Sequence, residues 1–167
     1  MITITIKTAS VISDIRIKSQ MNTERIKDPE ERYAVRAGEE NGSEVMEGLQ
    51  EAFRSLKSLC RRFLQATDDT AGNDAFDSST TDKTLTFDVT ERRTSNIADS
   101  LAQDIHNYLV GGTLRRFYTS AMMPDLVTLY GATENNARDE IVNLLYRKLE
   151  PVWEEDEPEQ SEEQQEP

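Results

Sequence analysis

The sequence predicts a mainly helical protein, a helical bundle with a small two-stranded β element. Apolar residues recur at spacings of three and four over most of the chain, whereas two short segments, about 2–7 and 84–89, alternate apolar and polar residues. The length of 167 residues suits a single domain that buries its own core. We expect this domain to span 1–153 and to be followed by an acidic, disordered tail at 154–167.

The two alternating segments have the composition of strands. The first has isoleucine at every second position, and the second carries Leu85, Phe87 and Val89. Because two strands alone are marginally stable, we expect the pair to rest on the helices or to join a neighbour's sheet. Residues 68–84, which precede the second strand, are predicted to form a long polar loop with five aspartates and one lysine.

Local start signals delimit three helices in the first half of the chain. Ser10 is a candidate cap for a short helix, although an extended segment through 15–17 is the alternative. Asp28 followed by Pro29 is typical of a helix start and predicts a second short helix. Ser43 is predicted to cap the clearest helix, which carries a long apolar stripe directed into a core or towards a partner helix.

Two longer helices are predicted in the second half. The first is capped by Thr90 or Thr94 and reaches Gly111–Gly112, beyond which the apolar positions move to the opposite side. Either the glycines break this helix, or one continuous helix is buried on both faces; we predict a break or kink. The last helix is expected to start at Pro124 and to end near Glu150, because a proline follows.

The charge is unevenly distributed. The chain carries a net charge of −13, and residues 154–167 contain eight acids and no base, so removing them leaves −5. A pI near 4.5 argues against direct sequence-specific nucleic-acid binding and against docking on anionic membranes. The N-terminal residues lack a continuous apolar region and no run of about 18 apolar residues occurs, so we expect neither a signal peptide nor a membrane span. These features predict a cytoplasmic protein.

The single histidine and the single cysteine limit the catalytic chemistry that the chain can support. His106 lies away from the apolar face of its predicted helix and is interpreted as an exposed surface residue. Cys60 lies on an apolar stripe and is interpreted as a buried structural thiol, although a reactive thiol beside Arg61 and Arg62 is the alternative. We therefore predict no catalytic residue and no enzymatic activity.

The aspartates of the 68–84 segment suggest calcium at first sight, because hard cations take oxygen ligands. Their spacing does not match a calcium-binding loop, since no start places Gly72 at the sixth position with a glutamate at the twelfth. The sequence also lacks nucleotide-binding glycine motifs and zinc signatures. We predict neither a metal nor a cofactor.

Three arginine doublets distinguish this acidic chain. Arginine pairs well with carboxylates and is enriched at protein interfaces. Ordinary ion pairs within the chain would explain the doublets; the alternative is that they receive acidic surfaces, or the acidic tail, of neighbouring copies. The predicted interface residues are Arg61, Arg62, Arg92, Arg93, Arg115 and Arg116.

The strand TLTFDV and the helical segments LAQDIHNYLVGGTLRRFY and DEIVNLLYRKLEPVW give a layout that resembles the head-to-tail connector proteins of tailed phages and prophages. The resemblance implies a helical domain with a β element that docks into a ring, which would place the protein in a virion. We therefore expect a non-enzymatic structural subunit that binds other protein subunits, as a homo-oligomer. The alternative is an acidic adaptor whose tail binds a basic partner.

Overall fold

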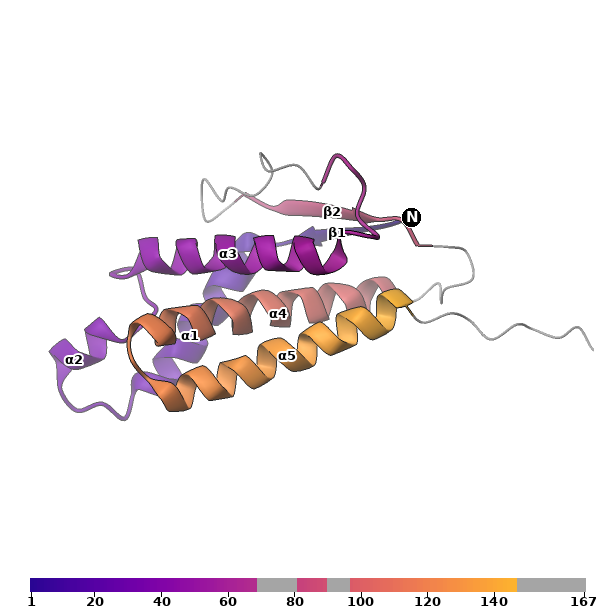
Figure 1. The fold of residues 1–167 in the computed structure, drawn as a ribbon. Coiled ribbons are helices and arrows are strands. Elements are labelled where there is room, and N and C mark those ends of the chain that lie inside the picture. The colour runs from indigo at the N-terminus through magenta and orange to yellow at the C-terminus, as the bar shows by residue number, and fades with distance from the viewer. Residues whose placement is uncertain (69–80, 90–96, 147–167) are drawn as a thin grey trace, which may run out of the picture.

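The computed structural model describes residues 1–68, 81–89 and 97–146. Within these ranges the chain is mainly helical, with a two-stranded antiparallel sheet (Figure 1), which confirms the predicted fold class. The elements are β1 (Ile2–Ile6), α1 (Thr8–Thr23), α2 (Pro29–Ala34), α3 (Gly42–Cys60), β2 (Lys83–Phe87), α4 (Ile97–Ser120) and α5 (Pro124–Tyr146). No helix in the described part of the chain is both long and apolar enough to cross a membrane.

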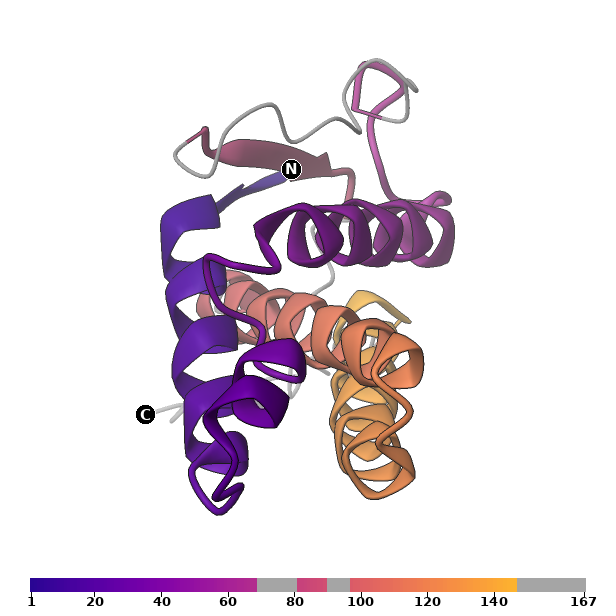
Figure 2. The same ribbon diagram turned by 90° about the vertical axis from the view of Figure 1, so that its left-hand side faces the viewer.

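Helix α4 is the centre of the fold. It contacts α1, α3, α5 and β1, and Figure 2 shows it between α1 and α5 with α3 crossing above. Half of its length is buried, on more than one side of the helix, because a central helix must present apolar residues to several neighbours. The side chains that it buries fully include Leu101, Ile105, Leu109, Leu114 and Tyr118.

The predicted break at Gly111–Gly112 is wrong, because α4 runs without interruption through both glycines. Their role is in packing between helices. A Cβ atom at Gly111 would lie 3.0 Å from the backbone nitrogen of Glu134 and 3.3 Å from the carbonyl oxygen of Tyr130, both on α5. The missing side chain therefore lets the two helix backbones approach closely, and the change of apolar face marks a helix buried on both sides.

The sheet lies over α3 and contributes its inner face to the core (Figure 1). Ile4 faces Leu85 and Ile2 faces Phe87 in the antiparallel register. Residues 63–65, which follow α3, hydrogen-bond to the other side of β2, so β2 has neighbours on both edges. The ribbon thus rests on the helices, as the first of the two predicted arrangements requires.

The helix starts follow the sequence signals only in part. The Asp28 carboxylate accepts a hydrogen bond from the backbone of Glu30, which confirms the predicted cap of α2. In contrast, α1 begins at Thr8, so Ser10 lies within the helix. The segment around 15–17 is therefore helical, and the first helix is longer than predicted.

Several predictions concern parts of the chain outside the described residues. These are the caps Thr90 and Thr94, the helix end at Glu150, most of the 68–84 segment and the tail at 154–167.

Candidate functional site

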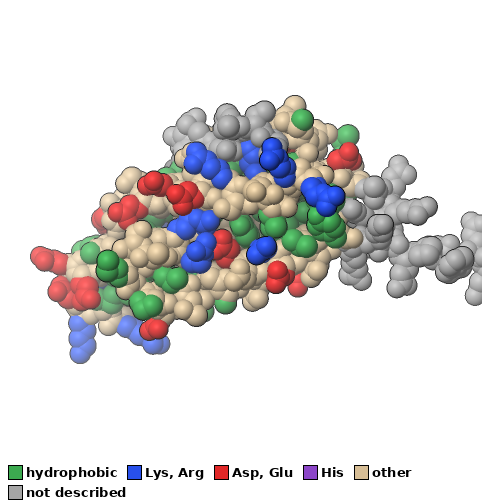
Figure 3. Space-filling model, in the orientation of Figure 1, with side chains coloured by type: hydrophobic (Ala, Val, Ile, Leu, Met, Phe, Trp, Pro, Cys, Tyr) green, Lys and Arg blue, Asp and Glu red, His purple; other side chains and the backbone are tan. Residues whose placement is uncertain are grey.

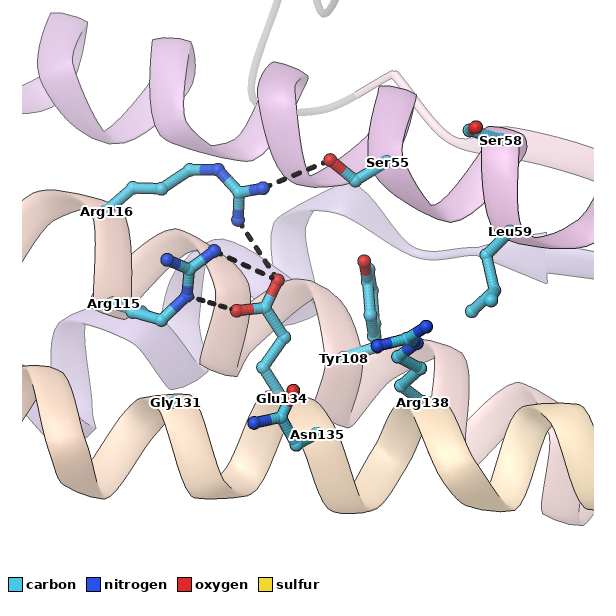
Figure 4. A pocket seen from close by; sticks show the side chains of 10 residues that line it. All are labelled: Ser55, Ser58, Leu59, Tyr108, Arg115, Arg116, Gly131, Glu134, Asn135 and Arg138. Carbon is cyan, nitrogen blue, oxygen red and sulfur yellow. Dashed lines mark hydrogen bonds and ion pairs between the residues drawn. The ribbon is translucent and has the colours of Figure 1, made fainter.

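A polar cleft lies between α3, α4 and α5. Its volume is about 520 Å³, and side chains of all three helices line it (Figure 4). Figure 3 shows the same side of the molecule, on which Lys and Arg side chains gather along the middle and acids gather towards the beginning of α3. The lining residues are Ser55, Ser58, Leu59, Tyr108, Arg115, Arg116, Gly131, Glu134, Asn135 and Arg138.

One arginine doublet and a buried glutamate form the inner wall of the cleft. Glu134 is only 7% exposed and pairs with both Arg115 and Arg116, the latter at 3.3 Å. Arg116 also donates to the Ser55 hydroxyl at 3.1 Å and pairs with Glu51 at 3.4 Å. The hydrogen bond with Glu134 raises the pKa of Arg115, because it stabilises the charged guanidinium. This doublet therefore joins α3, α4 and α5 within the chain.

Glycine creates the space in which this ion-pair network lies. A Cβ atom at Gly112 would come within 3.0 Å of both an Arg116 guanidinium nitrogen and a Glu134 carboxylate oxygen. Arg116 also donates to the Gly112 carbonyl oxygen at 2.9 Å. The sequence signal for this site was present in the adjacent glycine and arginine doublets. Their relation to Glu134 could not be predicted, because it depends on how α5 crosses α4.

The outer part of the cleft holds a hydroxyl and a guanidinium that no other described lining residue pairs with. Tyr108 is 5% exposed, and in Figure 4 its hydroxyl points into the cleft without a hydrogen bond to the other residues drawn. Arg138 lies beside the Tyr108 ring and forms no ion pair with the lining residues. Burial and the Glu134 carboxylate raise the pKa of the Tyr108 hydroxyl, whereas Arg116 and Arg138 oppose that rise. The hydroxyl is therefore neutral at physiological pH and can donate a hydrogen bond.

The arrangement is suited to holding a carboxylate or another anion. Three arginines line the cleft with one glutamate. When Glu51 at the rim is included, the described residues leave one positive charge unbalanced, that of Arg138. Arginine forks bind carboxylates through two parallel hydrogen bonds. The ten lining residues include no histidine, cysteine or lysine. The lining is therefore polar, with arginine and hydroxyl donors around an open space.

The other two doublets are not brought to this cleft. Arg61 and Arg62 are exposed in the turn that follows α3. Arg92 and Arg93 lie outside the described residues. Of the six predicted interface arginines, the cleft lining therefore contains only Arg115 and Arg116. The lining also contains Arg138, which the doublet pattern missed because it is a single arginine.

The interpretation of His106 as an exposed surface residue is wrong. Its side chain is 21% exposed, and its Nε2 atom lies 2.7 Å from a carboxylate oxygen of Asp14 on α1. A second hollow, of about 330 Å³, adjoins this pair. The position of His106 relative to one apolar face was uninformative, because α1 and β1 cover α4 from further directions.

Cys60 is a buried structural thiol, as predicted. It is fully buried at the end of α3, and burial raises its pKa from the usual 9.0 to about 12. Of the predicted loop aspartates, Asp68 accepts a hydrogen bond from the backbone nitrogen of Thr86 at 2.7 Å, which is a structural role. Among the described residues, no group of acids, histidine or cysteine has a geometry that could hold a metal ion.

Comparison with models of protein families, with curated protein sequences and with solved structures finds no match to this chain. The fold and the cleft describe a mainly helical protein with an arginine-lined cleft.

Proposed function

We propose that this protein is a non-enzymatic structural subunit of an oligomeric assembly and that the cleft between α3, α4 and α5 is a contact site for an acidic surface of a neighbouring copy. The observation that carries the proposal is Arg138 beside the Tyr108 hydroxyl, in a chain of net charge −13. Within the described part of the chain, Arg138 has no ion pair and the hydroxyl has no hydrogen bond. Such a basic site is suited to a carboxylate-bearing partner, and copies of this chain carry many carboxylates.

The position in the assembly is proposed from the layout of the chain. A helical domain with a small β ribbon resembles connector proteins at the head-to-tail junction of tailed phages, which form rings. A subunit of such a ring would be found in the cytoplasm before assembly and in the virion afterwards. Closed rings arise from head-to-tail contacts between different surfaces of neighbouring copies. In this proposal the basic cleft of one copy meets an acidic surface of the next.

The mass of the full-length chain in solution tests the proposal. Light scattering over about 1 to 100 µM should give a mass that rises from 19.0 kDa towards a defined multiple. Arg138→Glu should lower the association, because it places a negative charge where an acid is expected to bind. The matched control is Arg25→Glu, the same charge change at an exposed residue that does not line the cleft. A single-chain mass throughout the series overturns the proposal.

The alternative of an acidic adaptor depends on residues 154–167, whose eight acids would bind a basic partner. Replacing those acids with Gln and Asn separates the two functions. An assembly subunit keeps its association when the tail is neutralised, because the contact is made by the body of the protein. An adaptor loses its partner and the salt dependence of binding.

A further inference from the structure

We propose that the cleft holds the chain's own acidic C-terminal segment, residues 154–167, and that this segment competes with other acidic partners for the site. The docking involves a single chain and goes beyond the assembly function. Only the effect of this docking on association between copies rests on the proposed assembly function.

The first support is the unsatisfied capacity of the cleft. Arg115 and Arg116 are held by Glu134, whereas Arg138 and the Tyr108 hydroxyl have no such partner among the residues that line the site. A buried tyrosine usually finds a hydrogen-bond partner for its hydroxyl. A carboxylate that enters between Arg138 and Tyr108 would meet a guanidinium and a hydroxyl donor together.

The second support is reach. Arg138 lies eight residues before the end of α5 at Tyr146, about 12 Å along the helix at 1.5 Å per residue. Residues 147–153 can span at most about 25 Å when fully extended. The acidic segment of the same chain can therefore return to the cleft. A tether of this length holds it at an effective concentration in the millimolar range, well above the concentration of a second copy in dilute solution.

The third support is charge. The segment carries eight acids and no base, and no more than two residues separate one acid from the next, so many registers of the segment place a carboxylate near Arg138. The site does not require a particular sequence motif, because one fork and one hydroxyl recognise one carboxylate. Docking of this kind is expected to weaken as salt screens the charges.

The single tryptophan of the chain makes the docking measurable. Trp153 immediately precedes the acidic segment, so quenching of its fluorescence by acrylamide, a neutral quencher, reports how accessible this part of the chain is. In the full-length protein, Arg138→Gln should raise the quenching constant about twofold, because the docked fraction of a segment held at millimolar effective concentration falls when its main contact is removed. Exchanging the eight acids for Gln and Asn should have the same effect, and so should about 0.5 M NaCl.

Two further variants give the experiment its controls. Arg25→Gln removes one exposed positive charge outside the cleft and should leave the quenching constant at the wild-type value. Tyr108→Phe removes only the hydroxyl and should give a smaller rise than Arg138→Gln. Circular dichroism confirms that each variant is folded. Equal quenching of wild type, Arg138→Gln and the neutralised segment overturns the proposal.

The concentration series distinguishes the chain's own segment from that of a neighbour. Protection of Trp153 that stays constant from about 1 to 100 µM supports docking within one chain, whereas protection that develops only at the higher concentrations overturns it. If the docking also regulates assembly, neutralising the segment shifts association to lower concentration in light scattering. If the protection of Trp153 stays constant but the chain never associates, docking of the segment is supported and the assembly function is refuted. The two proposals can therefore fail independently.

Discussion

The close approach of α5 to α4 at Gly111 leads to a quantitative prediction. Replacing Gly111 with Ala would place a Cβ atom 3.0 Å from the backbone nitrogen of Glu134, 3.3 Å from the Tyr130 carbonyl oxygen and 3.3 Å from the Thr133 methyl carbon. Two of these atoms belong to the α5 backbone and cannot rotate away. The helices must therefore separate by a few tenths of an ångström, which loosens packing along both.

Two effects of opposite sign determine the magnitude. Overpacking a well-packed interior by one methyl group costs about 1–3 kcal/mol. Exchanging glycine for alanine inside a helix gains about 1 kcal/mol. Because the contact is with backbone atoms, we expect the cost to exceed the gain and the free energy of unfolding to fall by about 1 kcal/mol, which for a chain of this length lowers the Tm by about 2–4 °C.

Gly131→Ala is the matched control. Gly131 also lies inside a helix, but a Cβ atom there would meet only the Arg115 side chain, at an ordinary distance of 3.4 Å. The helix-propensity gain should then appear alone, as a stabilisation of up to about 1 kcal/mol. Urea unfolding followed by circular dichroism at about 222 nm measures both variants. The reasoning is refuted if Gly111→Ala is as stable as wild type or is stabilised as much as Gly131→Ala.

Three further predictions follow from buried or paired groups. Cys60 should react with iodoacetamide about 1,000-fold more slowly in the native than in the urea-unfolded protein at pH 8. The reason is that a pKa of about 12 instead of 9.0 lowers the fraction of reactive thiolate. Timed alkylation followed by mass spectrometry measures the two rates. Burial raises the pKa of Tyr118 from 10.0 to about 12, so the unfolded state loses that proton first and the free energy of unfolding should fall between pH 10 and 12; Tyr118→Phe should reduce the fall in urea titrations. A double-mutant cycle of Asp14→Asn and His106→Gln should give a coupling energy of about 0.5–1 kcal/mol, and additive effects on unfolding would contradict the pairing.

The sequence was sufficient to predict the secondary-structure content, because the relevant signals are local. Alternation around Ile4 and Leu85 reflects a ribbon with one face in the core, and the stripe of α3 reflects a helix with one buried side. Asp28 caps the start of α2 and Pro29 is its first residue, so this signal lies within a few residues of the helix start. Each of these signals depends on residues close together in the sequence, so the secondary structure can be predicted from one sequence without knowing the tertiary contacts.

The predictions were wrong where the structure depends on contacts between elements that lie far apart in the sequence. Glycine in a helix interior costs stability when considered locally, so Gly111–Gly112 resembled a break. The compensating contact comes from Glu134, more than twenty residues later, and depends on how two helices cross. The misinterpretation of His106 has the same origin, since its partner Asp14 lies on a helix 92 residues earlier in the chain.

The arginine doublets show how far the sequence alone could predict the candidate site. Neighbouring positions on a helix point about 100° apart, so a doublet alone does not determine which partners its members meet. Arg115 and Arg116 nevertheless converge on one carboxylate, because the buried Glu134 lies between them on the facing helix. Arg138 carried no doublet signal, yet it is the cationic group that this arrangement leaves without an acidic partner in the cleft.

Stability and the proposed binding therefore depend on the same packing of α4 against α5 but on different charged residues. The close approach at Gly111 lets α5 carry Glu134 inward, where its charge is used to hold Arg115 and Arg116. Arg138, one turn further along α5, remains on the rim beside Tyr108. An exposed arginine with no ion pair among the described residues contributes little to the packing of a helix pair, so removing it should leave the free energy of unfolding nearly unchanged. Substitution of Gly111 should therefore change stability first, whereas substitution of Arg138 should change binding alone.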